Sequence, residues 1–267
     1  MTTLVVTDLD GTLWDHELRC HRATRAAIDE LVSRGDVELL AATGRRRNSA
    51  RRAYEMNGFT LPSVLLNGAV GFDFSADAIF HQVTFAAADL RQTLDVLADF
   101  GLAPVGYLTD TRVFAIPGVT TGAKHLHSLG DDLHWSTLEE LAVRADVLGM
   151  SMLGIEVAAV EPALGALGLL DGVQVAAYGD HVYPPYSLML APANVTKEVG
   201  IRAYMAHAGI VPDQIIAVGD GGNDLEMLAM ADVALAVVGG DQRALDLADH
   251  FIERPEDGGW AKVLDFV

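Results

Sequence analysis

Short apolar runs alternate with segments of helical periodicity along the first quarter of the chain. Three of these runs have the length of buried parallel strands: residues 4–6, 37–42 and 64–66. Residues 22–34 and 46–56, which lie between the runs, predict helices, and in the first of them Ile28 and Leu31 fall at helical spacing. This order of strands and helices predicts a parallel sheet with helices on its faces.

Residues 84–190 follow a different pattern from the segments on either side. After a predicted hairpin at 67–83, short strands mix with helices: strands at 104–108, 112–116, 147–153, 173–177 and 187–191, and helices around 90–97, 138–144 and 159–169. Regular alternation then resumes, with helices at 197–207, 224–231 and 241–249 and strands at 215–218 and 233–237. We therefore predict an α/β fold in which residues 1–83 and 191–267 form a doubly wound, Rossmann-like core and residues 84–190 form an inserted α+β domain.

The composition narrows the range of partners. Hydrophobic residues make up 51% of the chain, enough for a sizeable core, while 37 acidic residues against 18 basic ones give a net charge of −19. Such a surface repels nucleic acid and anionic lipid, so we expect neither as a partner. Oligomeric state cannot be read from the sequence.

Cysteine content and hydropathy bear on the compartment. Cys20 is the single cysteine, so no intramolecular disulfide can form, which fits a reducing environment. The first residues lack the basic and apolar regions of a signal peptide, and no apolar run reaches the roughly 18 residues of a membrane span. We expect a cytoplasmic protein.

The first candidate motif, Asp8-Leu9-Asp10-Gly11-Thr12, directly follows the first predicted strand. Ligands bind at the carboxyl ends of strands in open α/β sheets. Two carboxylates at this spacing can divide the work, one attacking phosphorus and holding a cation while the other moves a proton. An acidic turn without function is the alternative. Trp14 follows closely, where shielding of the site and ordinary packing are both open.

Two further signals are weaker when taken alone. Thr43-Gly44-Arg45 follows the second strand, where a hydroxyl, a bare backbone and a cation suit phosphoryl oxygens, although a helix N-cap with a surface arginine is the simpler interpretation. Lys197 lies at a predicted helix start, where the helix dipole disfavours a cation, and this slightly favours a functional role over a solvated one.

The last motif, residues 219–224 (Gly-Asp-Gly-Gly-Asn-Asp), lies between an apolar strand and a helix. Its glycines permit close backbone approach, and Asp220 at the strand end is the type of hard oxygen ligand that Mg²⁺ prefers. Asn223 and Asp224 can bond a phosphate, a lysine or metal-bound water. So many polar groups in one turn argue against a simple capping turn.

In this order the four motifs resemble those of haloacid dehalogenase (HAD) superfamily phosphatases, and most of all the Cof-type branch with its large α+β (C2-type) cap. The resemblance covers essentially the whole chain. Two pairs outside the four motifs also match: Asn67 with Gly68, and Gly209 with Ile210. Glu198 departs from the pattern, because that branch usually has glycine after the lysine.

The resemblance implies a role for each motif residue. Asp8 would attack the phosphorus and become a transient aspartyl phosphate, and Asp10 would act as acid and then as base. Mg²⁺ would be held by the Asp8 carboxylate, the Asp10 main-chain carbonyl and Asp220, with Asp224 orienting its neighbours. The residues that would bind the phosphate or substrate are Leu9, Thr43, Gly44, Arg45, Asn67, Lys197 and Asn223. Four acidic side chains would repel a phosphate unless a divalent cation were present, so the charge count also favours a metal.

The resemblance further implies a phosphatase acting on a small phosphorylated metabolite, foremost a sugar phosphate, with the inserted domain selecting the substrate. A sugar phosphomutase shares the core chemistry and stays an alternative. A phospho-aspartate signalling receiver needs neither Asp10 nor the insert, and a cation-pumping ATPase lacks an acid at the Asp10 position. An inactive binding protein is disfavoured because every expected catalytic residue is present.

Overall fold

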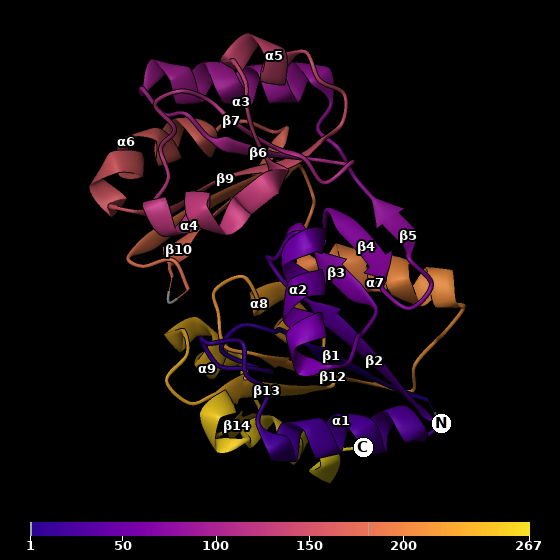
Figure 1. The fold of residues 1–267 in the computed structure, drawn as a ribbon. Helices are drawn as coiled ribbons and strands as arrows, with labels where there is room; N and C mark the ends of the chain where they lie inside the picture. The colour runs from indigo at the N-terminus through magenta and orange to yellow at the C-terminus, as the bar shows by residue number, and fades with distance from the viewer. Residues whose placement is uncertain (1, 181) are drawn as a thin grey trace. The chain divides into compact units, whose positions relative to one another are not determined.

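The computed structural model describes residues 2–180 and 182–267 and divides the chain into two compact units (Figure 1). Met1–His81 and Thr196–Val267 form the first unit, and Gln82–Val195 form the second. The first is therefore built from two chain segments that flank the second. Whether the second unit selects a substrate stays a prediction.

The sheet of the first unit has the strand order β14-β13-β12-β1-β2-β3-β4-β5. Strands β14 to β3 in this order pair in parallel, and β4 turns back antiparallel to β3. The strands are β1 Thr3–Thr7, β2 Val37–Ala42, β3 Ser63–Leu65, β4 Val70–Asp73, β5 Ala78–Gln82, β12 Gln214–Gly219, β13 Val233–Val237 and β14 His250–Ile252.

Helices cover both faces of this sheet. They are α1 Arg22–Ser33, α2 Arg47–Asn57, α7 Lys197–Ala208, α8 Leu225–Ala229 and α9 Gln242–Leu247, with the short 3₁₀ helices η1 Leu66–Gly68, η3 Pro255–Asp257 and η4 Gly259–Asp265. Leu4 and Val6 share a buried core with residues of α7, α8 and α9. Successive strand residues point to opposite faces, so Val5 lies on the other face, where α1 packs against β2 and η4.

The chain order reverses between β1 and β12. From β1 the sheet grows through β2 to β3 on one side, while the later strands β12, β13 and β14 extend it on the other. Ligands of open α/β sheets bind outside the carboxyl ends of the strands at such a reversal. The turns after Thr7 and Gly219 therefore meet at the one edge of the sheet where a site is expected.

The second unit is an α+β structure with its own core. Its sheet has the order β10-β11-β9-β6-β7-β8, antiparallel except for the β7–β8 pair. The strands are β6 Val105–Leu108, β7 Val113–Ala115, β8 Leu133–Trp135, β9 Val147–Ile155, β10 Val173–Gly179 and β11 Tyr186–Pro192. The helices are α3 Ala87–Asp99, α4 Ala123–Leu129, η2 Gly130–Asp132, α5 Leu138–Ala142 and α6 Val157–Leu167. The buried Leu90, Leu94 and Leu97 of α3 anchor this core.

The predicted fold class, a doubly wound parallel sheet with an inserted α+β unit, is confirmed. Among the α-helices and strands of the described residues, three short elements were not predicted: α4, β8 and β14. In α4 only His125 and Leu129 are buried, and β8 has no fully buried residue, so neither carries a clear hydrophobic period. Within the described residues, no helix has the length and apolar character needed to cross a bilayer.

The approach of α7 to β3 depends on Gly200, because a Cβ there would lie 2.3 Å from Cγ1 of Val64. We expect Gly200→Ala to lower the free energy of unfolding in urea by about 1–3 kcal/mol, through overpacking. In a Val64→Ala background the same change should be neutral or stabilising, because the cavity accepts the new methyl group and alanine is the better helix former. An equal loss in both backgrounds would contradict a steric cause.

Candidate active site

The turn after β1 presents the first motif at the reversal point of the sheet. Asp8 continues the strand pairing, since its amide donates to the Val218 carbonyl at 2.8 Å. The Thr12 hydroxyl donates to Oδ1 of Asp220 at 2.8 Å, which joins the first motif to the last. Gly11 has a φ of +81°, and a Cβ there would lie 2.6 Å from Oδ2 of Asp220, so only glycine allows this approach.

The turn after β12 is held together by the side chain of Asp224. Its Oδ2 accepts from the amides of Asp220 at 3.0 Å and Gly221 at 2.8 Å. Its Oδ1 accepts from Nζ of Lys197 at 2.5 Å. Both oxygens of this fully buried carboxylate are therefore engaged, and Asp224 acts as an anchor for the turn and for the lysine.

Lys197 is the first residue of α7, where the hydroxyl of Thr196 caps the helix by accepting from the Val199 amide. Its side chain is fully buried, and its Nζ lies 2.6 Å from Oδ1 of Asp8 as well as 2.5 Å from Asp224. The ammonium group thus bridges the ends of β1 and α8. Sequence reasoning placed Lys197 in the site, and the structure brings it to both aspartates.

Thr43, Asn67 and Asn223 lie next to one another at the same edge. The Asn67 amide donates to the Thr43 carbonyl at 3.0 Å, and Nδ2 of Asn223 donates to Oδ1 of Asn67 at 3.0 Å. Asn67 takes a left-handed φ of +53°. Amide and hydroxyl groups therefore gather at this edge of the sheet, and such groups suit phosphoryl oxygens.

Leu9 and Gly44 can contribute main-chain groups. The side chain of Leu9 is buried in the core, and its carbonyl accepts from the amides of Leu13 and Trp14, which closes the turn after β1. Gly44 lies between Thr43 and Arg45, whose amide donates to the Thr43 hydroxyl at 3.1 Å. Whether either residue binds a phosphate stays a prediction.

Arg45 contacts Asp10, a pairing that the sequence did not predict. Its Nε lies 2.6 Å from Oδ2 of Asp10 and its Nη2 lies 2.6 Å from Oδ1, which is a two-pronged ion pair. Nη1 of Arg45 donates to the Ser49 hydroxyl at 2.8 Å. Trp14 also donates, from Nε1 to Oδ1 of Asp10 at 3.1 Å. The predicted contact of Arg45 with a phosphate stays a prediction.

Burial dominates the electrostatics of this cluster. It raises the pKa of Asp8 well above its ordinary range, and Lys197 opposes that shift while Asp224 and Asp220 add to it. Burial likewise raises the pKa of Asp220 to about 7, with Asp224 acting in the same direction. For Lys197, burial favours the neutral amine, but Asp224 and Asp8 outweigh it and raise the pKa. The single ammonium group of Lys197 therefore does not neutralise all the negative charge of Asp8, Asp220 and Asp224.

The carboxylates fit a divalent cation. Asp8, Asp220 and Asp224 each offer an oxygen, and these oxygens all lie within 4.8 Å of one another. Oxygen donors of this kind suit Mg²⁺, which is hard and keeps several of its waters. A cation here would also counter the burial and the neighbouring carboxylates that raise the pKa values of Asp8 and Asp220. The acidic cluster thus has the chemistry of a metal site.

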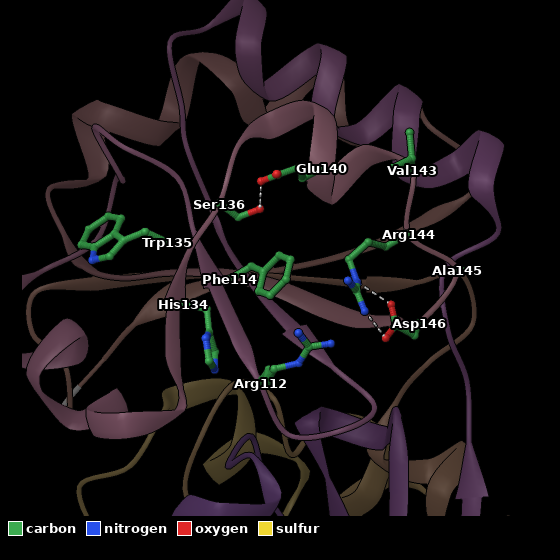
Figure 2. Close-up of a pocket in the computed structure, with 10 residues that line it drawn as sticks. All are labelled: Arg112, Phe114, His134, Trp135, Ser136, Glu140, Val143, Arg144, Ala145 and Asp146. Atoms are coloured by element: carbon green, nitrogen blue, oxygen red, sulfur yellow. Dashed lines mark hydrogen bonds and ion pairs between the residues drawn. The ribbon is translucent and has the colours of Figure 1, made fainter.

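The second unit contains a hollow of about 730 Å³ beside β7 and β8 (Figure 2). Its lining comprises Arg112, Phe114, His134, Trp135, Ser136, Glu140, Val143, Arg144, Ala145 and Asp146. Arg112 and Arg144 stack on the Phe114 ring at 5.5 and 4.9 Å, and each pairs with an aspartate two residues away. Their charges are therefore compensated, and none of the predicted catalytic residues lines this hollow.

Comparisons with known proteins agree with this geometry. The family model of haloacid dehalogenase-like hydrolases matches residues 5–141 and 181–264. The chain is 24% identical to a phosphoglycolate phosphatase of Methanopyrus kandleri, over 99% of this chain and 96% of that protein. It is also 24% identical to the chloroplastic endoribonuclease YBEY of Arabidopsis thaliana, over 94% of this chain but only 44% of that longer protein.

A solved structure shows the same fold. The HAD subclass IIB sugar phosphatase BT4131 superposes with a TM-score of 0.78 at 19% identity, covering 99% of this chain and 98% of the other. At this identity the likeness concerns the fold. It extends over both units of the chain, so the inserted α+β unit is part of the shared architecture.

Protons and Mg²⁺ should compete for Asp220. Without metal, burial raises the pKa of folded Asp220 to about 7, whereas the pKa of an unfolded aspartate is about 4. The unfolded state thus binds fewer protons in this window, and this group makes the free energy of unfolding fall as pH rises. We expect Mg²⁺ to raise the melting temperature more at pH 8 than at pH 5.5. Asp220→Asn removes one of the proposed ligands, so it should lose most of the Mg²⁺ effect at both pH values. An equal Mg²⁺ effect at both pH values in the unaltered protein would contradict the assignment.

Proposed function

Because the chain belongs to the haloacid dehalogenase-like hydrolase family, we propose that it is a magnesium-dependent phosphatase that hydrolyses a small phosphorylated metabolite through an aspartyl-phosphate intermediate. The observation that carries the proposal is the position of Asp8. Its carboxylate lies at the reversal point of the sheet, 2.6 Å from a buried lysine and beside Asp220. This arrangement supports Asp8 as the nucleophile, with Lys197 offsetting part of the negative charge.

In the first step, an oxygen of Asp8 attacks the phosphorus and forms a P–O bond while the bond to the leaving oxygen breaks. Asp10 gives a proton to that leaving oxygen, which departs as an alcohol. In the second step, Asp10 takes a proton from a water molecule that attacks the phosphorus, and the bond to Asp8 breaks. Inorganic phosphate leaves, and both aspartates return to their first state.

The surrounding residues neutralise and orient charge. Lys197 compensates the negative charge that gathers on the phosphoryl oxygens, which phosphoryl transfer requires more than covalent assistance. Thr43, Gly44 and Asn223, with the amide of Leu9, would donate hydrogen bonds to these oxygens, and Asn67 would orient Asn223. The carboxylates of Asp8 and Asp220 and the Asp10 carbonyl would hold Mg²⁺. When bound, the ion supplies further charge neutralisation for the phosphate.

We assign substrate selection to the unit Gln82–Val195 and place a sugar phosphate first among the candidates. The similar structure of a sugar phosphatase supports this choice, while the relative named as a phosphoglycolate phosphatase supports a smaller acidic substrate. Both are small phosphate monoesters. A protein with a net charge of −19 is poorly suited to nucleic-acid substrates, and the proposal therefore stays with metabolites. We further propose a cytoplasmic location.

The test is phosphate release from a panel of sugar phosphates, phosphoglycolate and other phosphorylated metabolites, with and without Mg²⁺. We expect release that depends on Mg²⁺ and falls by at least about 10³-fold in Asp8→Asn, because the nucleophile is lost. Asp36→Asn, on the exposed surface next to Arg34, is the matched control and should keep full activity. Formation of an isomerised sugar phosphate without free phosphate would instead indicate a phosphomutase. If the folded protein turned over none of the compounds, the proposal would be wrong.

A further inference from the structure

We propose that Trp14 and Arg45 are positioning residues that together hold the carboxylate of Asp10 in one orientation for proton transfer. This inference rests on the proposed function. Three donors from two segments of the first unit converge on Asp10: Nε1 of Trp14 and Nη2 of Arg45 on Oδ1, and Nε of Arg45 on Oδ2. Neither residue is assigned this role by its motif.

The turn after β1 places the indole of Trp14 on Asp10. The Trp14 amide donates to the Leu9 carbonyl at 3.1 Å, and the Gly11 amide donates back to the Trp14 carbonyl at 3.0 Å. The fully buried indole packs edge-on against Tyr54, with ring centroids 5.7 Å apart. A tight turn and a packed ring therefore fix the direction of its N–H group.

Arg45 reaches Asp10 from the turn after β2 and is itself fixed. Its third donor, Nη1, bonds the Ser49 hydroxyl in the first turns of α2, and its guanidinium carbon lies 5.8 Å from the Trp14 ring centroid. Its carbonyl accepts from the Leu66 amide at 3.0 Å. The planar guanidinium of an arginine can donate two parallel hydrogen bonds to one carboxylate, whereas the ammonium of a lysine cannot.

These contacts leave a defined place for the proton. An ionised carboxylate has about four lone-pair positions, and three of them on Asp10 accept from Trp14 and Arg45. The fourth position, on Oδ2, is then the one from which a proton passes to the leaving oxygen. Side-chain rotation of Asp10 would break all three bonds together, so the acid is held in place before substrate arrives.

The distinguishing readout is the dependence on the leaving group. An alkyl phosphate needs its leaving oxygen protonated, whereas 2,4-dinitrophenyl phosphate departs as a stable anion and does not. We expect Trp14→Phe to lower kcat for the alkyl substrate by about 3–10-fold and Arg45→Lys by about 10–100-fold, with a much smaller loss for the dinitrophenyl substrate, because a misplaced acid is costly only where protonation is needed. KM should change little.

A double-mutant cycle separates positioning from direct phosphate binding. In an Asp10→Asn background, Trp14→Phe and Arg45→Lys should cause no further loss of kcat, because the group they orient is already gone. If Arg45 instead binds phosphate, its substitution will raise KM for both substrates and will remain additive with Asp10→Asn. Tyr54→Phe is the matched control, since it keeps the ring packed on Trp14 and removes one buried hydrogen bond to Ser63 but no donor to Asp10.

A second measurement does not depend on activity. The chain has three tryptophans, so its ¹⁵N spectrum carries three indole signals, and Trp14→Phe identifies the one from Trp14. Asp10→Ala should shift that signal strongly and leave those of Trp135 and Trp260 in place. The inference would be overturned if the signal did not move, or if Trp14→Phe slowed an active enzyme equally on both substrates. Either result would leave the proposed phosphatase function intact. A shifted signal in a protein without phosphatase activity would overturn the catalytic role of the contact together with the proposed function.

Discussion

The candidate active site depends on the buried ammonium of Lys197. It lies between Asp8 and Asp224, and the side chains of the lysine and of Asp224 are completely inaccessible to solvent. Removal of one partner from such a pair leaves an uncompensated buried charge and costs roughly 3–5 kcal/mol. Because the three residues come from both chain segments of the first unit, the cluster forms only when those segments have folded together.

The topology explains why such distant residues meet. Strands β1 and β12 are neighbours in the sheet although more than 200 residues separate them, and their parallel pairing brings both carboxyl ends to one edge. Close approach of the turns then requires residues without side chains. Gly11 lies against Asp220, and a Cβ on Gly68, at a φ of +118°, would lie 2.1 Å from the Thr196 carbonyl oxygen. The glycines of these motifs thus serve the geometry that gathers the charges.

The places of the motifs in the fold were predictable because each motif follows a strand or precedes a helix, which are positions that hydrophobic periodicity reveals. Asp8, Lys197 and Asp220 are brought together as those positions imply. The pairing of Arg45 with Asp10 was not predictable in this way, since it depends on side-chain direction across two separate turns. For the same reason the indole of Trp14 could be assigned neither to packing nor to the site, and it takes part in both.

The acidity of the whole protein is compatible with the proposed phosphate substrate because charge acts locally. The Debye length is about 8 Å at physiological ionic strength, so exposed acidic groups further away are largely screened. The segment from the turn after Thr43 to the middle of α2 carries five of the 18 basic residues of the chain: Arg45, Arg46, Arg47, Arg51 and Arg52. The guanidinium groups of Arg47 and Arg51 stack on the ring of Phe72, and this contact restricts the movement of both side chains. Arg45 pairs with Asp10 and Arg51 with Asp77, so part of this positive charge is already compensated. Under the proposed function, a cation held by the buried carboxylates would supply the further positive charge that a phosphate dianion needs.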